Sequence, residues 1–273
     1  MKRKLQRIGL AVGMVVALGG AAAVVPLQAA EQTQVNALVK KDAIKLVNIA
    51  GKQRMLSQRI AKDYLYMGKH IATDKARKQL DASLKEFRQN QKKLAEMIND
   101  PEIKNLLEFV NMSLSELEGI VKKPFSLDNA QLVLDLSESM LEGSQYVVDS
   151  LNNALHIKES KIVAISGKQR MLAQRIAKYY IAYQAGIKDK NTVDQMDAAV
   201  KEFSKDHKIL MENKDNTATI NQDLAKVDKL WKVVYKFYLN IEKGGLPFIV
   251  FTTTDDITKK MDVITKLYVE LYK

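Results

Sequence analysis

The chain has 273 residues and no cysteine, which excludes disulfides, thiol nucleophiles, cysteine metal sites and haem attached through cysteine. Its formal charge is +11, but four of the basic residues lie in the first seven positions, and the others alternate with Asp and Glu. Charges mixed in this way are typical of solvated helix faces. We therefore expect no nucleic-acid partner, and the mildly basic surface favours small anionic ligands instead.

The N-terminal segment predicts export. The basic residues of the first seven positions precede an apolar run at 8–25, which is the pattern of a secretory signal. The cleavage pattern before Glu31 is imperfect, and a run of about 18 apolar residues is just long enough to span a bilayer, so an uncleaved anchor is the alternative. We expect residues 1–30 to be a signal peptide or an anchor, and the rest of the chain to be periplasmic.

The body of the chain is predicted to be helical. Apolar residues recur at three- and four-residue spacing between the few prolines, and Pro101 and Pro124 mark breaks. The first half is predicted to contain helices at 33–71, 74–98 and 101–122, and a fourth from Leu127 onward. The fold class is therefore all-α, and up-down bundles are the natural packing for sets of four helices.

A long internal repeat divides the chain. Residues 49–65 (IAGKQRMLSQRIAKDYL) and 165–181 (ISGKQRMLAQRIAKYYI) differ at only four of seventeen positions. A core needs only apolar residues of about the right size, so polar residues kept in both copies indicate a role beyond packing. We predict two tandem four-helix modules, at 31–145 and 146–273.

The connection between the modules has two interpretations. From Asp128 to Ala185 there is no proline, and the only glycines are Gly143 and Gly167. This favours one continuous helix of about 85 Å, which would stack the bundles end to end. With such a rod, Arg54 and Arg170 would face symmetry mates in a homodimer. Alternatively, the chain folds back and pairs these two arginines with each other, so that the duplication acts as a built-in pseudo-dimer.

Each copy places one arginine in a strip of small residues. Arg54 and Arg170 have no carboxylate within a turn on this strip. A partly buried guanidinium needs an anion, and its planar fork suits a planar oxyanion. The anion could instead be an Asp or Glu from another helix, or the side chain could reach water along its aliphatic stem.

Other motif residues surround these arginines. A glycine lies one position from each strip, and a glutamine follows each arginine by one turn. The candidate ligand-binding residues are thus Arg54, Arg170, Gly51, Gly167, Gln58 and Gln174. Most of the other polar residues common to both copies are predicted to face solvent. In the first copy these residues are Lys52, Gln53, Arg59 and Lys62.

The run from Asn48 to Arg59 resembles the first-helix signature of the PilJ/NarX-type sensor domain, the periplasmic input module of type IV pilus chemotaxis transducers and nitrate/nitrite sensor kinases. The second copy lacks the Asn, and Ala173 replaces Ser57. The resemblance implies a four-helix bundle, a homodimer, and binding of a nitrate- or nitrite-like anion by Arg54 and Arg170. Because the second copy departs from the family motif at these positions, it can be a structural scaffold that binds no ligand.

No enzymatic chemistry is predicted. His70, His156 and His207 lie far apart, and phosphate loops and nucleophile elbows are missing from the sequence. We therefore expect no catalytic residue, metal or cofactor. Because the printed sequence contains no kinase or methyl-accepting region, a membrane-bound transducer or sensor kinase is the expected partner. A structural or protein-interaction role without a small ligand is the alternative.

Overall fold

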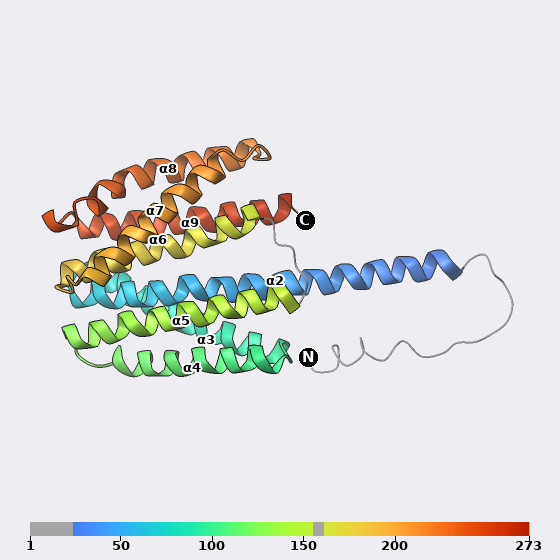
Figure 1. Ribbon diagram of the computed structural model, residues 1–273, viewed down its shortest axis with the longest axis horizontal. Coiled ribbons are helices and arrows are strands. Elements are labelled where there is room, and N and C mark those ends of the chain that lie inside the picture. Colours follow the sequence, from blue (N-terminus) through green and yellow to red (C-terminus); the bar gives the residue numbers. More distant parts are fainter. Residues whose placement is uncertain (1–23, 155–160, 273) are drawn as a thin grey trace. The chain divides into compact units, whose positions relative to one another are not determined.

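The computed structural model describes residues 24–154 and 161–272, with side chains from residue 45 onward. This part of the chain is all-α and contains no strand, which confirms the predicted fold class. Its helices, labelled in Figure 1, are α2 (Val24–Gly68), α3 (Thr73–Met97), α4 (Pro101–Ile120), α5 (Leu127–Ala154), α6 (Lys161–Ala185), α7 (Lys190–Met211), α8 (Ala218–Tyr238), the 3-10 helix η1 (Ile241–Lys243) and α9 (Pro247–Leu271).

The chain divides into two compact units, residues 1–42 and 43–273. The first unit contains the beginning of α2, and the predicted signal segment lies mostly outside the described residues. Within the described residues, no helix combines the length and the apolar character needed to cross a membrane. The second unit contains the rest of α2 and every later helix, and it is where the candidate site lies.

Local sequence signals set several helix starts. The carboxylate of Asp100 accepts hydrogen bonds from the backbone N–H groups of Glu102 and Ile103, and Pro101 occupies the first turn of α4. Asp189 caps α7 in the same way, through the N–H of Thr192. Side chains that satisfy exposed N–H groups stabilise a helix end by about 1 kcal/mol, so these positions fix where the outer helices begin.

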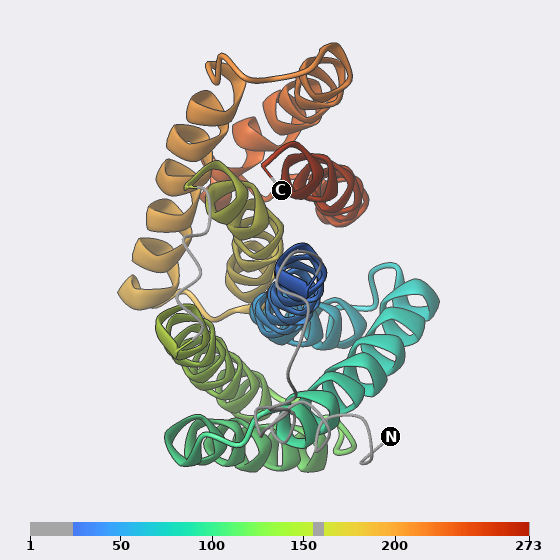
Figure 2. The same ribbon diagram turned by 90° about the vertical axis from the view of Figure 1, so that its right-hand side faces the viewer.

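Four helices form the centre of the second unit: α2, α5, α6 and α9. Helix α2 contacts α5 through Gln58 and α9 through Lys62, and α6 contacts the same two helices through Gln174 and Lys178. Both α2 and α6 run antiparallel to α5 and α9, and therefore parallel to each other. Figure 2 looks along these helices and shows α3 and α4 on one side of the central group and α7 and α8 on the other.

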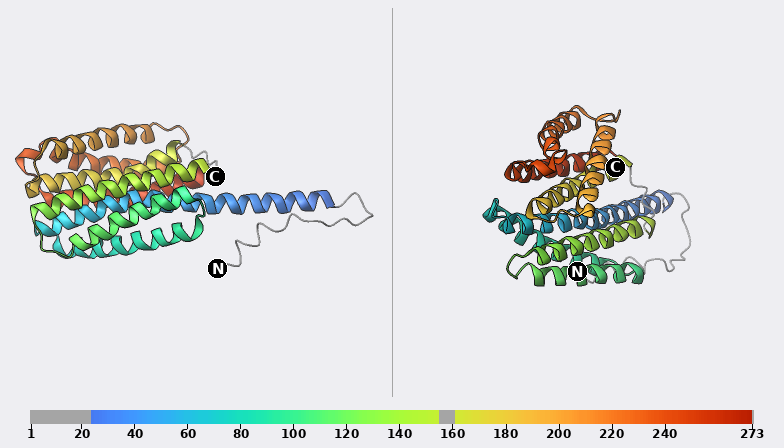
Figure 3. Two further views of the ribbon diagram at one scale, coloured as in Figure 1. Left: turned by 60° about the horizontal axis from the view of Figure 1, so that its bottom comes forward. Right: turned by 60° about the vertical axis from the view of Figure 1, so that its left-hand side comes forward.

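The predicted continuous helix is wrong. Glu138 of α5 forms ion pairs with Arg175 and Lys178 of α6. A straight helix would separate residues 138 and 178 by about 60 Å, so the chain must reverse between the end of α5 and the start of α6, as Figure 3 also shows. The predicted helix over residues 155–160 lies outside the described residues. The chain folds back, as the alternative expected, and the two repeats pair side by side, but the ion-pair partner of Arg170 is Asp262 of α9.

One apolar cluster spans both repeats. It contains Leu56 and Ile60 of α2 together with Leu172 and Ile176 of α6, and all four side chains are fully buried. At about 25 cal/mol per Å² of apolar surface, such a shared core makes the pairing of the repeats part of the folded state. A smaller cluster lies at the other end of the first repeat, around Leu94 and Leu107.

Candidate functional site

The two motif arginines lie along their own helices, folded back over the preceding turn. Nε of Arg54 donates to the carbonyl of Gly51 at 3.4 Å, and Nε of Arg170 donates to the carbonyl of Gly167 at 3.3 Å. A methyl group at Gly51 would lie 3.3 Å from Nη2 of Arg54, and one at Gly167 would lie 3.5 Å from Nη2 of Arg170. The glycine three positions before each arginine therefore leaves room for the guanidinium.

The last helix of each repeat presents a different partner to the arginine. Nη1 of Arg54 donates to the amide oxygen of Gln145 on α5, at 2.6 Å. Nη1 of Arg170 instead lies 2.5 Å from a carboxylate oxygen of Asp262 on α9. Arg170 is only 5% exposed, whereas Arg54 is half-buried. Of the two alternatives for the second copy, an Asp from another helix is therefore the one that the structure adopts.

The ionisation of Asp262 reflects this contact. Burial raises the pKa of its carboxyl, but the hydrogen bond from Lys266 and the charge of Arg170 outweigh burial and hold the pKa below its usual value. Arg170 and Asp262 thus form an ionised pair near neutral pH. The positive charge of the second motif arginine is balanced within the chain.

The two candidate glutamines point into the central helix group. Nε2 of Gln58 donates to the carbonyl of Ser137 on α5, at 3.0 Å, and Nε2 of Gln174 donates to Thr258 on α9, at 2.8 Å. Both glutamines are fully buried, and their Oε1 atoms have no hydrogen-bond partner among the described residues. Each glutamine therefore anchors its helix to the last helix of its own repeat, one turn from the arginine.

The solvent-facing positions predicted for the remaining motif residues need correction. Gln53 is 1% exposed, and its Nε2 donates to the carbonyl of Phe87 on α3; Gln169 makes the matching bond to Phe203 on α7. Lys62 is fully buried. Lys52 and Arg59 are half-buried, and Lys52 pairs with Glu86. These residues recur because they join the first two helices of each repeat or lie where the repeats meet.

A buried ionic cluster joins the first repeat to α9. Nζ of Lys62 lies 2.7 Å from Oδ1 of Asp255 and 3.2 Å from Oδ1 of Asp63. All three side chains are at most 1% exposed, and Gln79 of α3 donates to the second oxygen of Asp255. Among the described residues, neither oxygen of Asp63 accepts a hydrogen bond of good geometry. Asp63 is therefore the poorly satisfied member of the cluster.

The pKa values of the two carboxyl groups in this cluster are shifted in opposite directions. Burial raises the pKa of Asp63 to about 7, although the charge of Lys62 partly opposes this. Burial also acts on Asp255, but the charge and hydrogen bond of Lys62 outweigh it and lower the pKa to about 2. Asp255 is therefore the ionised partner of Lys62, and Asp63 titrates near neutral pH.

The second repeat makes the reciprocal contact. Lys178, the counterpart of Lys62, pairs with Glu138 of α5, which also pairs with Arg175. Burial lowers the pKa of Lys178 to about 8, and Glu138 partly offsets the effect. Tyr179 occupies the position that corresponds to Asp63. Sequence reasoning missed both clusters, although the Asp-to-Tyr difference within an otherwise repeated segment was a signal for them.

The described residues contain no group of His, Asp and Glu side chains arranged to hold a metal ion. His70 is exposed, and His207 is buried against the ring of Phe203; His156 lies outside the described residues. The arrangement instead offers cations and amides that can hold anions. The two repeats are related by an approximate twofold axis, which places α2 in the position of α6 and α5 in the position of α9.

Comparison with known proteins identifies the repeat. The family model described as "Type IV pili methyl-accepting chemotaxis transducer N-term" (PilJ) matches the chain twice, at residues 35–123 and 156–244. No curated protein and no solved structure matches it. The matches cover more than half of the chain and include both motif arginines, which confirms the resemblance seen in the motif. The chain therefore belongs to the PilJ family of chemotaxis-transducer N-terminal domains and carries two copies of that domain.

Proposed function

We propose that this protein is a periplasmic, non-enzymatic sensory input module that binds a small oxyanion of the nitrate or nitrite type through Arg54. Its membership of a family of transducer input domains supports a signalling role. A membrane-bound transducer or sensor kinase is the proposed partner, because the family that the chain matches is described by the chemotaxis transducers to which its domains belong.

The observation that carries the proposal is the difference between Gln145 and Asp262. An anion arriving at Arg170 would have to displace Asp262, a carboxylate tethered at high local concentration and already 2.5 Å from the guanidinium. At Arg54 the partner on α5 is an uncharged amide, so an incoming anion displaces no negative charge when it takes the place of Gln145. Arg54 is also the more exposed of the two. We therefore assign the ligand to the first repeat and a scaffold role to the second.

The test is a set of thermal melts of the exported protein in nitrate, nitrite, sulfate, phosphate and small carboxylates. A ligand at a hundredfold over its Kd adds about 2.7 kcal/mol, and for a chain of this size each kcal/mol raises Tm by about 2–4 °C. We expect a shift in the wild type and in Arg170→Ala, and none in Arg54→Ala. The absence of a shift with every anion would contradict the proposal.

Exchanging the partners sharpens this test. Gln145→Asp gives Arg54 the internal carboxylate of the second repeat and is expected to abolish the anion response. Asp262→Asn gives Arg170 an amide partner and is expected to create a second, weaker response. An unchanged response in Gln145→Asp would show that the anion binds elsewhere, even if the protein binds nitrate.

The alternative, a structural or interaction module, has its own support. The small-residue strips are buried, including Ala50 and Ala61 in the first repeat and Ala173 and Ala177 in the second, so they act as helix contact surfaces within the chain. Mass measurement in the same series tests the predicted homodimer. A dimer that dissociates in Arg54→Ala, without any anion response in the wild type, would favour this alternative.

A further inference from the structure

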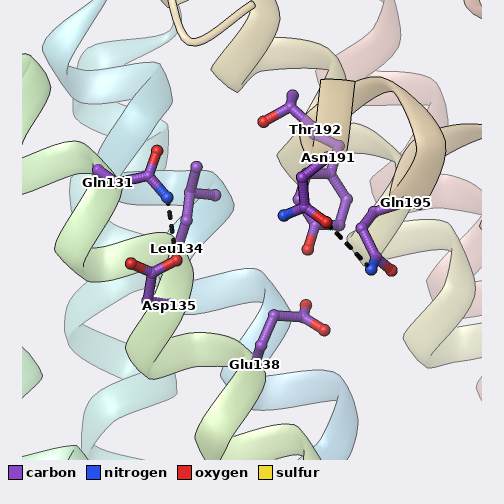
Figure 4. A pocket seen from close by; sticks show the side chains of 8 residues that line it. Gln131, Leu134, Asp135, Glu138, Asn191, Thr192 and Gln195 are labelled. Carbon is purple, nitrogen blue, oxygen red and sulfur yellow. Dashed lines mark hydrogen bonds between the residues drawn. The ribbon is translucent and has the colours of Figure 1, made fainter. Parts of the chain in front are cut away.

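A cavity of about 280 Å³ lies where α5 of the first repeat meets α6 and α7 of the second. Figure 4 shows Asp135 and Glu138 of α5 on one side of it and Asn191, Thr192 and Gln195 of α7 on the other. Ligand sites favour such boundaries between structural units, and most enclose roughly 300–1,000 Å³. At about 280 Å³ the cavity lies just below this range, so its size suits only a ligand of a few heavy atoms.

The twofold exchange of the repeats provides an internal comparison. The ion pair Glu138–Lys178 corresponds to the ion pair Asp255–Lys62. A residue of α5 therefore corresponds to the residue of α9 that lies 117 positions later in the sequence. The first two helices of the repeats correspond at a displacement of 116. By this correspondence the equivalent of the cavity lies where α9 meets α2 and α3.

At that equivalent position the space is filled. The ring of Phe251 is fully buried there, with its centroid 4.4 Å from Nζ of Lys62 and 5.0 Å from Nζ of Lys75. Leu134 stands in place of Phe251, and Asn191 stands in place of Lys75. The cavity side therefore has two smaller side chains where the other half has a phenylalanine and a lysine, although Tyr179 stands in place of the smaller Asp63.

The wall of the cavity is rich in hydrogen-bond acceptors. The oxygens of Glu138 accept hydrogen bonds from Lys178 and Arg175 of α6. The carboxylate of Asp135 is exposed; among the described residues it accepts one hydrogen bond, from Gln131, and forms no ion pair. An exposed carboxylate that lines a polar cavity and forms no close ion pair among the described residues favours a ligand that brings a cation.

We propose that this cavity binds a small polar molecule carrying a primary ammonium group, with Asp135 as its charged partner. The ammonium group supplies three donors to a wall that presents a carboxylate and carboxamide oxygens. In the other half Lys75, which corresponds to Asn191, places its own ammonium group beside Phe251, so a cation from within the chain occupies the region that the ligand's ammonium group would enter here. Lys75 also lies 3.6 Å from Asp255, the counterpart of Glu138.

The test is a titration of the full-length protein with putrescine, followed by NMR of methyl-labelled Leu134 and Thr192. We expect saturable shifts of both methyl signals, and at most weak shifts with the uncharged analogue 1,4-butanediol. Asp135→Asn should weaken putrescine binding about tenfold, which corresponds to about 1.4 kcal/mol. Asp256→Asn, which removes an exposed carboxylate of α9 outside the cavity, should leave binding unchanged.

Two further variants place the larger residues of the other half into the cavity. Leu134→Phe and Asn191→Lys introduce the residues of the filled half, and each should abolish the putrescine shifts; Asn191 is exposed, so the second variant is expected to fold even if the first does not. The proposal is overturned if putrescine causes no shift at about 10 mM. It is equally overturned if butanediol matches putrescine, or if Asp135→Asn and Asn191→Lys bind putrescine like the wild type. Because Arg54 takes no part, these outcomes are independent of the anion test.

Discussion

The two repeats hold their first two helices together in the same way but differ where they face each other. Gln53 and Gln169 each donate to a backbone carbonyl of the second helix, and a lysine–glutamate pair lies beside each bond. At the boundary between the repeats, Asp63 corresponds to Tyr179, and within the repeats the arginine partner Gln145 on α5 corresponds to Asp262 on α9. The contacts between the first two helices are therefore the same in both repeats, and the differences lie at the boundary between the repeats and on their last helices.

This pattern separates two reasons for repeated polar residues. Hydrogen bonds between neighbouring helices of one repeat are needed twice, so both copies keep them. A contact across the approximate twofold axis joins a residue of one repeat to a residue of the other. The two equivalent contacts use different residues, so a substitution can change one of them and leave the other as it is. The asymmetric positions are consequently where function can differ between the halves.

The largest expected contrast is between Lys62→Met and Lys178→Met. The first leaves Asp255 buried at 1% exposure without its closest cation, which should cost about 3–5 kcal/mol. The second leaves Glu138 at 29% exposure with Arg175 still beside it, which should cost about 1–2 kcal/mol. Urea unfolding measures both changes. Equal losses would show that the two ionic clusters are energetically alike despite their different burial.

Asp63→Asn should remove a pH dependence that only the first repeat has. Because the pKa of Asp63 is raised from 3.8 to about 7, the unfolded chain loses this proton first, and wild-type stability falls as pH rises from about 4 to about 7. At 1.36 kcal/mol per unit, the variant should gain about 4 kcal/mol over the wild type by pH 8 and almost nothing at pH 4. Urea unfolding across this range is the measurement.

The matched control for this prediction is Tyr179→Phe. Burial raises the pKa of Tyr179 further above its usual value, so the phenol stays neutral throughout the same range. Its stability difference from wild type should therefore not depend on pH. A flat difference for Asp63→Asn as well would mean that the carboxyl of Asp63 is hydrated or paired.

The smallest contrast concerns the shared helix tethers. Gln53→Ala breaks the bond to Phe87 and also leaves Asn90 without the amide oxygen to which it donates, so it should cost about 2 kcal/mol. Gln169→Ala breaks only the matching bond and should cost about 1 kcal/mol. Urea unfolding of both variants tests this order, and the reverse order would contradict the role given to Asn90.

Local chemistry made the outer helices predictable. The prediction of 101–122 for α4 came from Asp100 and Pro101, and the structure places this helix at Pro101–Ile120. The continuous helix was wrong because a lack of proline permits a helix but does not require one. Whether α5 and α6 continue or reverse depends on contacts between residues far apart in sequence, such as Glu138 and Lys178.

The candidate site was predictable only in part. Helical periodicity identifies one apolar face of a helix, and the polar residues are then placed in water. Helices α2 and α6 instead have neighbours on several sides, so Gln53 and Lys62 are buried although they lie off the main apolar stripe. The arginine–glycine arrangement followed from the motif, but the partners Gln145 and Asp262 come from distant helices and needed the fold.

Because the chain reverses between α5 and α6, each first repeat pairs with one second repeat of the same chain. Two domains joined in one chain meet at an effective concentration that a short linker holds in the millimolar range, so their pairing does not weaken on dilution. A dimer of identical chains must carry every substitution twice, at both symmetry-related positions. Here a single substitution changes one half alone, which gives this protein the freedom of a heterodimer while it is made from one chain.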